Sequence, residues 1–247
     1  SKDEHVNVHL KFNPGMNRYG FDQKDLNFVI HRLKNNLKLN VTSICSHLSS
    51  ADDTNKLDVS RKQINLFNTI SSALENNLNK KIERHILNSS GFMNLPGSQM
   101  NMVRLGISLY GSYNNINLQQ ISKLKSVVSQ NRNIEKGEGV GYSPDFIAKK
   151  TMNISIIPVG YADGLNRKFG NSIGNVIIKG VRCPIIGNIC MDSFIVDTSN
   201  VDCKEGDEVV IFGPKNTILS LSKKIGTIPY EVYSTLNRRI KRVYVDS

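Results

Sequence analysis

The stretch HLKFNPGMNRYGF, which runs from His9 to Phe21, decides how the first half of this chain folds. It completes an alternation of apolar residues from Val6 to Phe12, which is the pattern of a buried strand. The turn signal Asn13-Pro14-Gly15 comes next, and Arg18 follows before a helix begins. A strand, a turn and a cation in this order are how α/β enzymes hold a fixed cation at the carboxyl end of a strand. The same residues also fit a βα loop whose arginine pairs with a surface carboxylate.

Strands and helices alternate from this stretch to about residue 121, which predicts βαβ units and a parallel sheet. Further strands are predicted over residues 41–48, 82–87 and 102–108. Asp22 is predicted to cap one helix and Thr54 to open a longer one. Their buried faces are predicted from helical spacing to hold Leu26, Val29, Ile30, Leu33 and Leu37 in the first, and Phe67, Ile70, Leu74 and Leu78 in the second.

Short apolar runs separated by Gly and Asp replace this alternation from about residue 122. They predict a mostly antiparallel β domain with strands over 154–159, 176–178, 183–189, 194–196, 208–212 and 239–245, and helices over 218–225 and 229–236. We therefore expect an α/β protein with two domains, residues 1–121 and 122–247. A complete (β/α)₈ barrel takes about 250 residues, so the first domain is expected to be the second half of such a barrel. The chain begins at Ser1 inside a strand pattern, as a piece of a longer protein would, and an open half-barrel would expose strand edges.

The composition favours a cytoplasmic protein. The apolar runs are too short to span a bilayer and no signal peptide opens the chain. The four cysteines, at positions 45, 183, 190 and 203, lack the C-x-x-C spacing of a zinc site or redox motif, so no metal is expected. A formal net charge of +11 invites nucleic-acid binding. The basic residues are scattered, however, and no RNA-binding aromatic motif accompanies them.

Several motifs carry a more specific signal. They are SHLSSAD at 46–52, NSSG at 88–91, NMVRLGI at 101–107, VGYADG at 159–164, IGNICMD at 186–192 and PYE at 229–231. Together with the opening stretch they resemble, in order, patterns of the alanine racemase family: H-L-K-x-D-T-G-M-x-R-x-G, T-H-F-A-x-A-D, N-S-A, N-M-V-R-x-G-I, I-G-Y-A-D-G, V-G-R-I-C-M-D and x-Y-E. The resemblance covers essentially the whole chain, and the chain is similar to about the last two thirds of a family member.

The resemblance implies pyridoxal 5'-phosphate (PLP) as cofactor, which acts as an electron sink when a Cα proton is removed. It implies that Arg104 faces the pyridine nitrogen and, as a group that only donates, keeps that nitrogen unprotonated. His47 would link Arg104 to the catalytic tyrosine. The phosphate would be held by Ser89, the amides of Gly106 and Ile107, and the Tyr230 hydroxyl. Taken singly, Ser89 would sooner cap a helix and Tyr230 pack in a core.

The resemblance also places the catalytic base at Tyr142, within the sequence GVGYSP. A phenol has a pKa near 10 and needs nearby positive charge to act at neutral pH, which His47 and Arg104 would supply. Family members are head-to-tail homodimers, so Tyr142 would serve the partner's site. Substrate would be bound by Arg18 and by the backbone N–H of Met191. Supporting roles are implied for Lys11 (as an N-carboxylysine bracing Arg18), Tyr161 and Asp192. The chain departs from the family at Asn13-Pro14, where Asp-Thr is usual, and this puts the local hydrogen bonding in question.

One part of the family pattern does not occur in residues 1–247. The lysine that binds PLP, in a K-A-D-A-Y-G-like segment, would precede everything here and would serve as the second base. This chain alone is therefore expected to be inactive. The expected function of the whole is alanine racemase, which interconverts L- and D-alanine and supplies D-alanine for peptidoglycan in the cell wall. The alternatives are a racemase for serine, lysine or a broader set of amino acids, a truncated non-catalytic relative, and nucleic-acid binding.

Overall fold

The computed structural model describes residues 5–113 and 118–245. The chain folds as two compact units, Ser1–Gly106 and Ile107–Ser247. Residues 107–113 and 118–121 therefore belong to the second unit by their contacts, whereas the sequence pattern assigns them to the first domain. The domain boundary at 121/122 stays a prediction.

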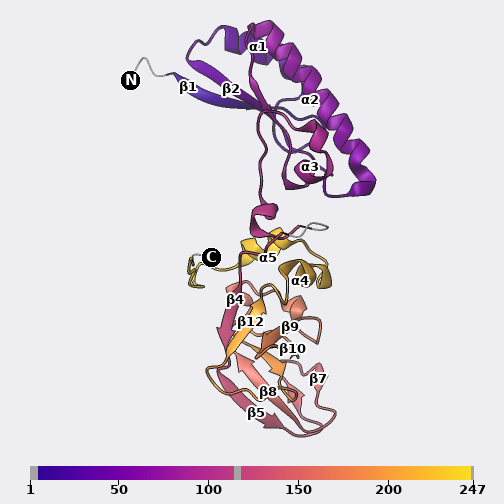
Figure 1. The fold of residues 1–247 in the computed structure, drawn as a ribbon, viewed down its shortest axis with the longest axis vertical. Coiled ribbons are helices and arrows are strands. Elements are labelled where there is room, and N and C mark those ends of the chain that lie inside the picture. Colours follow the sequence, from indigo (N-terminus) through magenta and orange to yellow (C-terminus); the bar gives the residue numbers. More distant parts are fainter. Residues whose placement is uncertain (1–4, 114–117, 246–247) are drawn as a thin grey trace. The chain divides into compact units, whose positions relative to one another are not determined.

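The first unit is built on a parallel three-stranded sheet in the order β1-β2-β3. β1 spans Val6–Lys11, β2 spans Leu39–Cys45 and β3 spans Glu83–His85. The helices α1 (Leu26–Lys34), α2 (Leu57–Leu78) and α3 (Ser89–Asn94) connect or follow these strands. Figure 1 shows α1 and α2 beside each other along the sheet. This βαβα order confirms the expected part of a (β/α)₈ barrel.

The register of the sheet places functional side chains at one end. Lys11 pairs with Cys45, and Cys45 pairs with His85, so three strands end level with one another. The segments that follow these strands carry Arg18, His47 and, as the first residue of α3, Ser89 in turn. The carboxyl ends of the parallel strands are thus the place where the predicted site residues of this unit gather.

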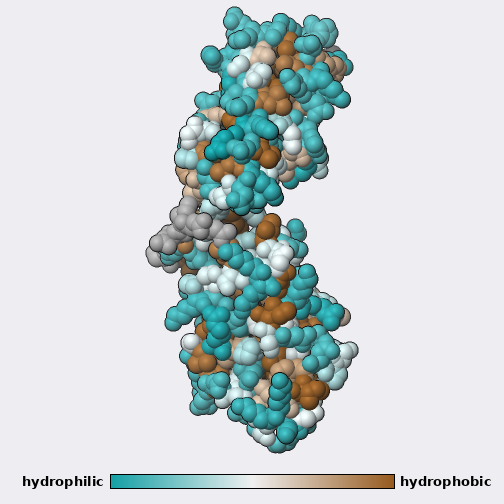
Figure 2. All heavy atoms as spheres, turned by 90° about the vertical axis from the view of Figure 1, so that its right-hand side faces the viewer, coloured by the Kyte–Doolittle hydropathy of each residue, from teal (hydrophilic) through white to brown (hydrophobic). Residues whose placement is uncertain are grey.

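The core of the first unit lies between the sheet and α2. Phe12, Ile44, Phe67, Ile70 and Leu74 are at most 1% exposed. Phe67, Ile70 and Leu74 form the predicted apolar stripe on α2, and the opposite face of the helix carries polar residues. The face of this unit seen in Figure 2 is accordingly mostly hydrophilic, with scattered hydrophobic patches.

Two predictions for this unit are wrong. Leu37 does not join the buried face of α1, because the helix ends at Lys34 and Leu37 is 83% exposed in the following turn. The strand predicted over 102–108 does not form. Here the chain makes one isolated bridge, between Asn88 and Arg104, and then a 3₁₀ turn at Ile107–Tyr110.

The second unit is a curled sheet in the order β4-β12-β9-β10-β11-β8-β5, with antiparallel pairing throughout. Its strands are β4 (Leu124–Val127), β5 (Gln130–Ile134), β8 (Met152–Ile157), β9 (Asn175–Ile178), β10 (Val181–Ile186), β11 (Phe194–Asp197) and β12 (Glu208–Phe212). A separate short hairpin pairs β6 (Gly139–Val140) with β7 (Phe146–Ile147). The helices α4 (Ile218–Lys224) and α5 (Pro229–Thr235) follow.

The two edge strands of this sheet are halves of one kinked segment. β4 and β5 are separated only by Val128 and Ser129. Val128 donates its N–H to Asp207 on the β12 side, and Ser129 donates to Ile156 on the β8 side. The sheet therefore curls until both of its edges meet the same stretch of chain (Figure 1). Its interior holds Ile157, Val176, Ile178, Phe194, Val196 and Val209, all fully buried.

The antiparallel β domain is confirmed, with differences in detail. The strand predicted over 239–245 is wrong, because this basic segment forms a turn and then irregular backbone. Strands β4 to β7 were not predicted, because β4 and β5 are rich in Lys, Gln, Asn and Arg and β6 and β7 are only two residues long.

Candidate functional site

The loop that carries Arg18 is organised by Asn13. The Asn13 side-chain oxygen accepts the backbone N–H of Asn17 at 2.8 Å and of Gly15 at 3.3 Å. Its amide nitrogen donates to the side chains of Asn17 (3.1 Å) and Asp22 (2.9 Å). An aspartate could accept the same two N–H groups but could not donate to Asp22. The asparagine that stands where the family pattern has aspartate thus has a nearby acceptor, the carboxylate of Asp22.

Backbone hydrogen bonds close the base of the same loop. Phe21 donates to the Lys11 carbonyl at 2.9 Å, and Asn13 donates to the Phe21 carbonyl at 2.8 Å. Gly20 is required between them, because its φ is +121° and a β-carbon there would lie 2.8 Å from the Phe12 carbonyl carbon. Arg18 is exposed in this closed loop. The Lys11 ammonium lies 5.7 Å from the centre of the Tyr19 ring.

Arg104 reaches across the carboxyl ends of β2 and β3. Its Nη1 donates to Nδ1 and to the carbonyl of His85, and its Nη2 donates to the Ser46 carbonyl and, at 3.3 Å, to Nδ1 of His47. These acceptors come from the end of β3 and from the loop after β2, so the guanidinium is fixed in one orientation. Burial lowers the pKa of Arg104 from its very high ordinary value.

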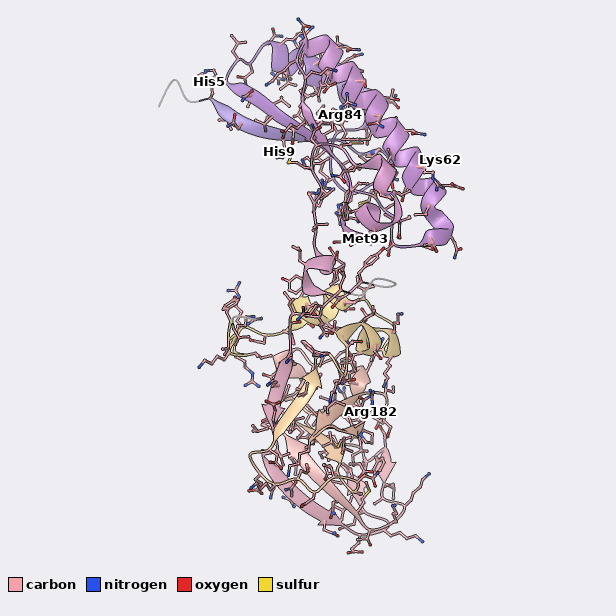
Figure 3. The ribbon with its side chains drawn as sticks, viewed as in Figure 1. His5, His9, Lys62, Arg84, Met93 and Arg182 are labelled. Carbon is pink, nitrogen blue, oxygen red and sulfur yellow. The ribbon has the colours of Figure 1, made fainter. Side chains whose placement is uncertain are left out.

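His85 is a site residue that the sequence reasoning missed. It ends β3, it is 5% exposed, and its Nε2 lies 3.1 Å from the Ser43 hydroxyl. Because Nδ1 accepts from Arg104, the neutral ring carries its proton on Nε2 and donates it to Ser43. The signal available in the sequence was a histidine at the end of a predicted buried strand, as at His47. His9 projects from β1 (Figure 3). Its ring centre lies 5.6 Å from that of His85.

Both histidines beside Arg104 have a lowered pKa, which favours their neutral forms at pH 7. Burial lowers the pKa of His85 to about 4, with Arg104 and His9 adding to the effect. Burial also lowers the pKa of His47, and the charges of Arg104, Arg18 and Lys11 lower it further. The lowered pKa of His47 disfavours a positive charge on this ring at neutral pH. Its role beside the catalytic tyrosine stays a prediction. The fixed positive charges beside these rings are the guanidinium groups of Arg18 and Arg104.

The predicted phosphate ligands form two hydrogen-bonded pairs. In the first unit the Gly106 N–H donates to the Ser89 hydroxyl at 2.8 Å, and in the second the Ile107 N–H donates to the Tyr230 hydroxyl at 3.2 Å. Asn88, not Ser89, caps α3 by accepting the Gly91 N–H. Tyr230 is 48% exposed, not packed in the core. Neither of the purely structural roles considered for Ser89 and Tyr230 is therefore observed.

Tyr142 lies in the tight turn between β6 and β7. Its side chain is 74% exposed. Gly141 before it and Ser143 after it both have positive φ, at +76° and +43°. The turn therefore presents Tyr142 at the surface of the second unit.

The motifs at 159–164 and 186–192 lie against each other. Tyr161 donates its N–H to the Cys190 carbonyl at 3.1 Å, and Ala162 donates to the Met191 carbonyl at 2.9 Å. Gly160 permits this approach, since a β-carbon there would lie 2.3 Å from the Met191 oxygen. Tyr161 and Met191 are 43% and 59% exposed, and Asp192 beside them is also exposed.

Asp163 anchors this arrangement from inside. Its carboxylate accepts the Gly160 N–H at 2.9 Å and pairs with Nε of Arg239. Burial would raise the pKa of Asp163, but these two donors outweigh it and lower the pKa. The glycine-aspartate motif at 159–164 is thus a brace for the backbone that carries Tyr161.

Comparisons with known proteins agree along the whole chain. The family described as "Alanine racemase, N-terminal domain" matches residues 1–114, and "Alanine racemase, C-terminal domain" matches residues 121–244. The chain is 36% identical over 260 residues to an alanine racemase of Helicobacter pylori strain Shi470, covering 97% of this chain and 68% of the relative. It is 34% identical to alanine racemase 1 of Caldanaerobacter subterraneus, covering 98% and 65%.

Solved structures give the same result. The alanine racemase of Streptomyces coelicolor A3(2) superposes with a TM-score of 0.92 at 28% identity, covering 99% of this chain and 67% of that one. That of Bartonella henselae, with covalently bound pyridoxal phosphate, has a TM-score of 0.83 at 31% identity, covering 98% and 66%. This chain spans about two thirds of the length of its relatives. Among its described residues, no helix is both long and apolar enough to cross a bilayer.

Proposed function

Because this chain belongs to the alanine racemase family, we propose that it supplies most of the active site of a PLP-dependent alanine racemase. The reaction exchanges the proton on Cα between its two faces. D-alanine for peptidoglycan is the proposed product in the cell, and the cytoplasm the proposed location. Two bases are needed, one on each face, and this chain offers Tyr142 as the base for L-alanine.

The observation that carries the proposal is the fixed orientation of Arg104. A guanidinium has five N–H donors and no acceptor. Those of Arg104 that face His85, His47 and the Ser46 carbonyl hold it in place. Nε is the N–H group that these contacts leave, and a pyridine nitrogen that accepted from it would stay unprotonated. PLP, when bound, supplies an electron sink for the Cα carbanion, and Arg104 keeps this sink weak enough to favour return of the proton over transamination.

The residues proposed for the phosphate fit an anion in their chemistry. Ser89 and Tyr230 offer hydroxyls, and Gly106 and Ile107 offer backbone N–H groups from consecutive residues. All four are neutral donors, which suits a phosphate held by hydrogen bonds. Each N–H already lies within hydrogen-bond distance of one of the hydroxyls.

The exposed residues of the second unit support a shared site in a head-to-tail homodimer. Tyr142, Tyr161 and Met191 are all large, apolar or aromatic, and more than 40% exposed. Side chains of this kind are enriched at interfaces between protein chains. We propose that they complete the partner's site, where Met191 would bind the substrate carboxylate by its N–H together with Arg18. Lys11 would brace Arg18 there, as an N-carboxylysine, with Tyr161 and Asp192 in support.

Racemisation by the full-length protein loaded with PLP tests this proposal. L-alanine should give D-alanine, and Tyr142→Phe should lower kcat by roughly 10²- to 10⁴-fold, the usual contribution of a general acid or base. The cofactor absorption spectrum should remain, because the phenol is proposed to move a proton and not to hold PLP. Tyr244→Phe is the matched control, since Tyr244 is 93% exposed and has no proposed role.

Three other outcomes would point elsewhere. Faster turnover of serine or lysine than of alanine would indicate a racemase of different or broader specificity. PLP binding without turnover of any amino acid would indicate a non-catalytic relative. A Tyr142→Phe enzyme as active as the Tyr244→Phe control would remove Tyr142 from the mechanism.

A further inference from the structure

The turn that carries Tyr142 has little of its own to hold it in place. The strands on either side, β6 and β7, are two residues long. Residues 141–145 are all exposed, so burial does not fix their side chains. A base must nevertheless be held within a fraction of an ångström of the proton it moves. Something outside the hairpin must therefore set the position of Tyr142.

Asn188 contacts this turn from another part of the chain. Its Nδ2 donates to the Tyr142 carbonyl at 3.1 Å and to Oδ2 of Asp145 at 2.9 Å. Its Oδ1 accepts from Nδ2 of Asn171 at 3.2 Å. One side-chain amide thus ties the catalytic residue's own backbone to the end of the turn and to a third segment.

The backbone around Asn188 lies against the same turn. A β-carbon at Gly187 would lie 2.7 Å from the Val140 carbonyl oxygen, and one at Gly141 would lie 3.6 Å from the Asn188 carbonyl oxygen. The N–H of Asn171 donates to the Gly187 carbonyl at 2.9 Å. The segment 187–188 is therefore fixed on both sides, so it can serve as a rigid support for the turn.

We propose that Asn188 is a positioning residue that fixes the Tyr142 turn through its side-chain amide, an inference that rests on the proposed function. Asn188 also lies three residues before Met191, in the motif IGNICMD. One short segment thereby sets the place of both residues that the second unit is proposed to contribute to substrate. The family pattern quoted above has arginine at this position, so this contact is argued from this chain alone.

The decisive variant is Asn188→Asp in the full-length protein. It keeps the size of the side chain, removes both donated hydrogen bonds and places a carboxylate against the Tyr142 carbonyl and the Asp145 carboxylate. We expect hydrogen–deuterium exchange in residues 140–147 to speed up several-fold. We also expect kcat to fall by about 10-fold or more, the scale expected from a misplaced group, with a smaller change in KM.

A kinetic isotope effect separates positioning from a general loss of structure. With Tyr142 displaced, proton removal from L-alanine becomes slower, so the effect of deuterium at Cα of L-alanine should rise. A merely structural role would lower the amount of active protein and leave this isotope effect unchanged.

The Asp145→Asn variant provides both a control and a rescue. Alone it keeps a side-chain oxygen as acceptor and should behave much like the wild type. Combined with Asn188→Asp it reverses the pair, because the amide introduced at position 145 can donate to the carboxylate introduced at position 188. The double variant should therefore restore part of the exchange protection and part of kcat.

Two results overturn the proposal: unchanged exchange at 140–147 in Asn188→Asp, or faster exchange with unchanged kcat and isotope effect. If the wild-type protein does not racemise alanine, the proposed function fails. The exchange measurement still decides whether Asn188 fixes the turn.

Discussion

Single polar atoms decide the geometry at the carboxyl ends of β1, β2 and β3. Asn13 holds the Arg18 loop with one acceptor and one donor atom. His85 holds Arg104 with one nitrogen and Ser43 with the other. Each of these side chains donates with one atom and accepts with another. A replacement of equal size that loses only one of the two atoms therefore tests one contact at a time.

Replacing Asn13 with the aspartate of the family pattern is expected to harm this protein. Asn13→Asp puts a carboxylate oxygen 2.9 Å from Asp22, where an amide now donates. The like charges should loosen the Arg18 loop and raise KM for alanine several-fold, with little change in kcat. Steady-state kinetics of the full-length enzyme measure this. The double variant Asn13→Asp/Asp22→Asn should recover the original KM, and a single variant with unchanged KM would contradict the argument.

His85 is expected to make the stability of the protein fall in acid. Its pKa is about 4 in the folded protein against 6.5 as the ordinary value, so the unfolded chain binds the extra proton first. Stability is then complete above pH 6.5 and is lost progressively as the pH falls toward 4. The loss amounts to about 3 kcal/mol at 1.36 kcal/mol per pKa unit, and His47 contributes in the same direction.

Urea unfolding between pH 4 and 7 measures this slope. His85→Gln should flatten it. His31→Gln, on the exposed side of α1, should leave it unchanged. An equal slope in the wild type and in His85→Gln would assign the acid sensitivity to other groups.

At the scale of elements, Glu75 fastens α2 to β3. Its side chain is 8% exposed, and the carboxylate accepts the Ile82 N–H at 2.9 Å and Nη2 of Arg84 at 2.5 Å. Burial would raise the pKa of Glu75, but the two donors outweigh it and lower the pKa. The last turn of the long helix is thereby tied to the start of the third strand.

Removing Glu75 should destabilise the first unit. Glu75→Ala leaves the largely buried Arg84 and the Ile82 N–H without their partner, at a cost of about 3 kcal/mol, whereas Glu75→Gln keeps one acceptor and should cost less. Denaturant unfolding gives the difference. Asp58→Ala removes the exposed pair with Arg61 and should change nothing measurable. Equal effects of Glu75→Ala and Asp58→Ala would show that the link to β3 contributes no stability.

The same elements show which features could be predicted from the sequence. The spacing of apolar residues predicted the long helix α2 correctly, because Phe67, Ile70 and Leu74 recur at helical spacing and are all buried. It failed where apolar residues had no core to face, as at Leu37 and over 239–245. The candidate site residues were predicted from motif order. His85 and Asn188 were missed because their roles depend on partners, Arg104 and Tyr142, that lie far away in sequence and are joined to them only by folding.

At the scale of the whole molecule, each unit has its own hydrophobic core, one centred on Phe67 and the other on Phe194. The predicted functional residues follow this division. Arg18, His47 and Arg104 lie in the first unit, and Tyr142 and Met191 in the second. A complete site as proposed therefore requires both units, and a full-length dimer is the species in which to measure it.

The kinked segment that joins β4 to β5 also dictates when the second unit can finish folding. On the ribosome β4 is the first strand of the second unit to emerge, yet its partner strand β12 follows 83 residues later, as the pair Lys125–Glu208 shows. Until β12 has been synthesised, β4 has no partner strand and forms an unpaired edge of the nascent sheet. Closure of such a distant pair is slow, and an unpaired margin is where nascent chains associate wrongly. During translation of residues 128–208 we therefore expect the second unit to be most prone to wrong association.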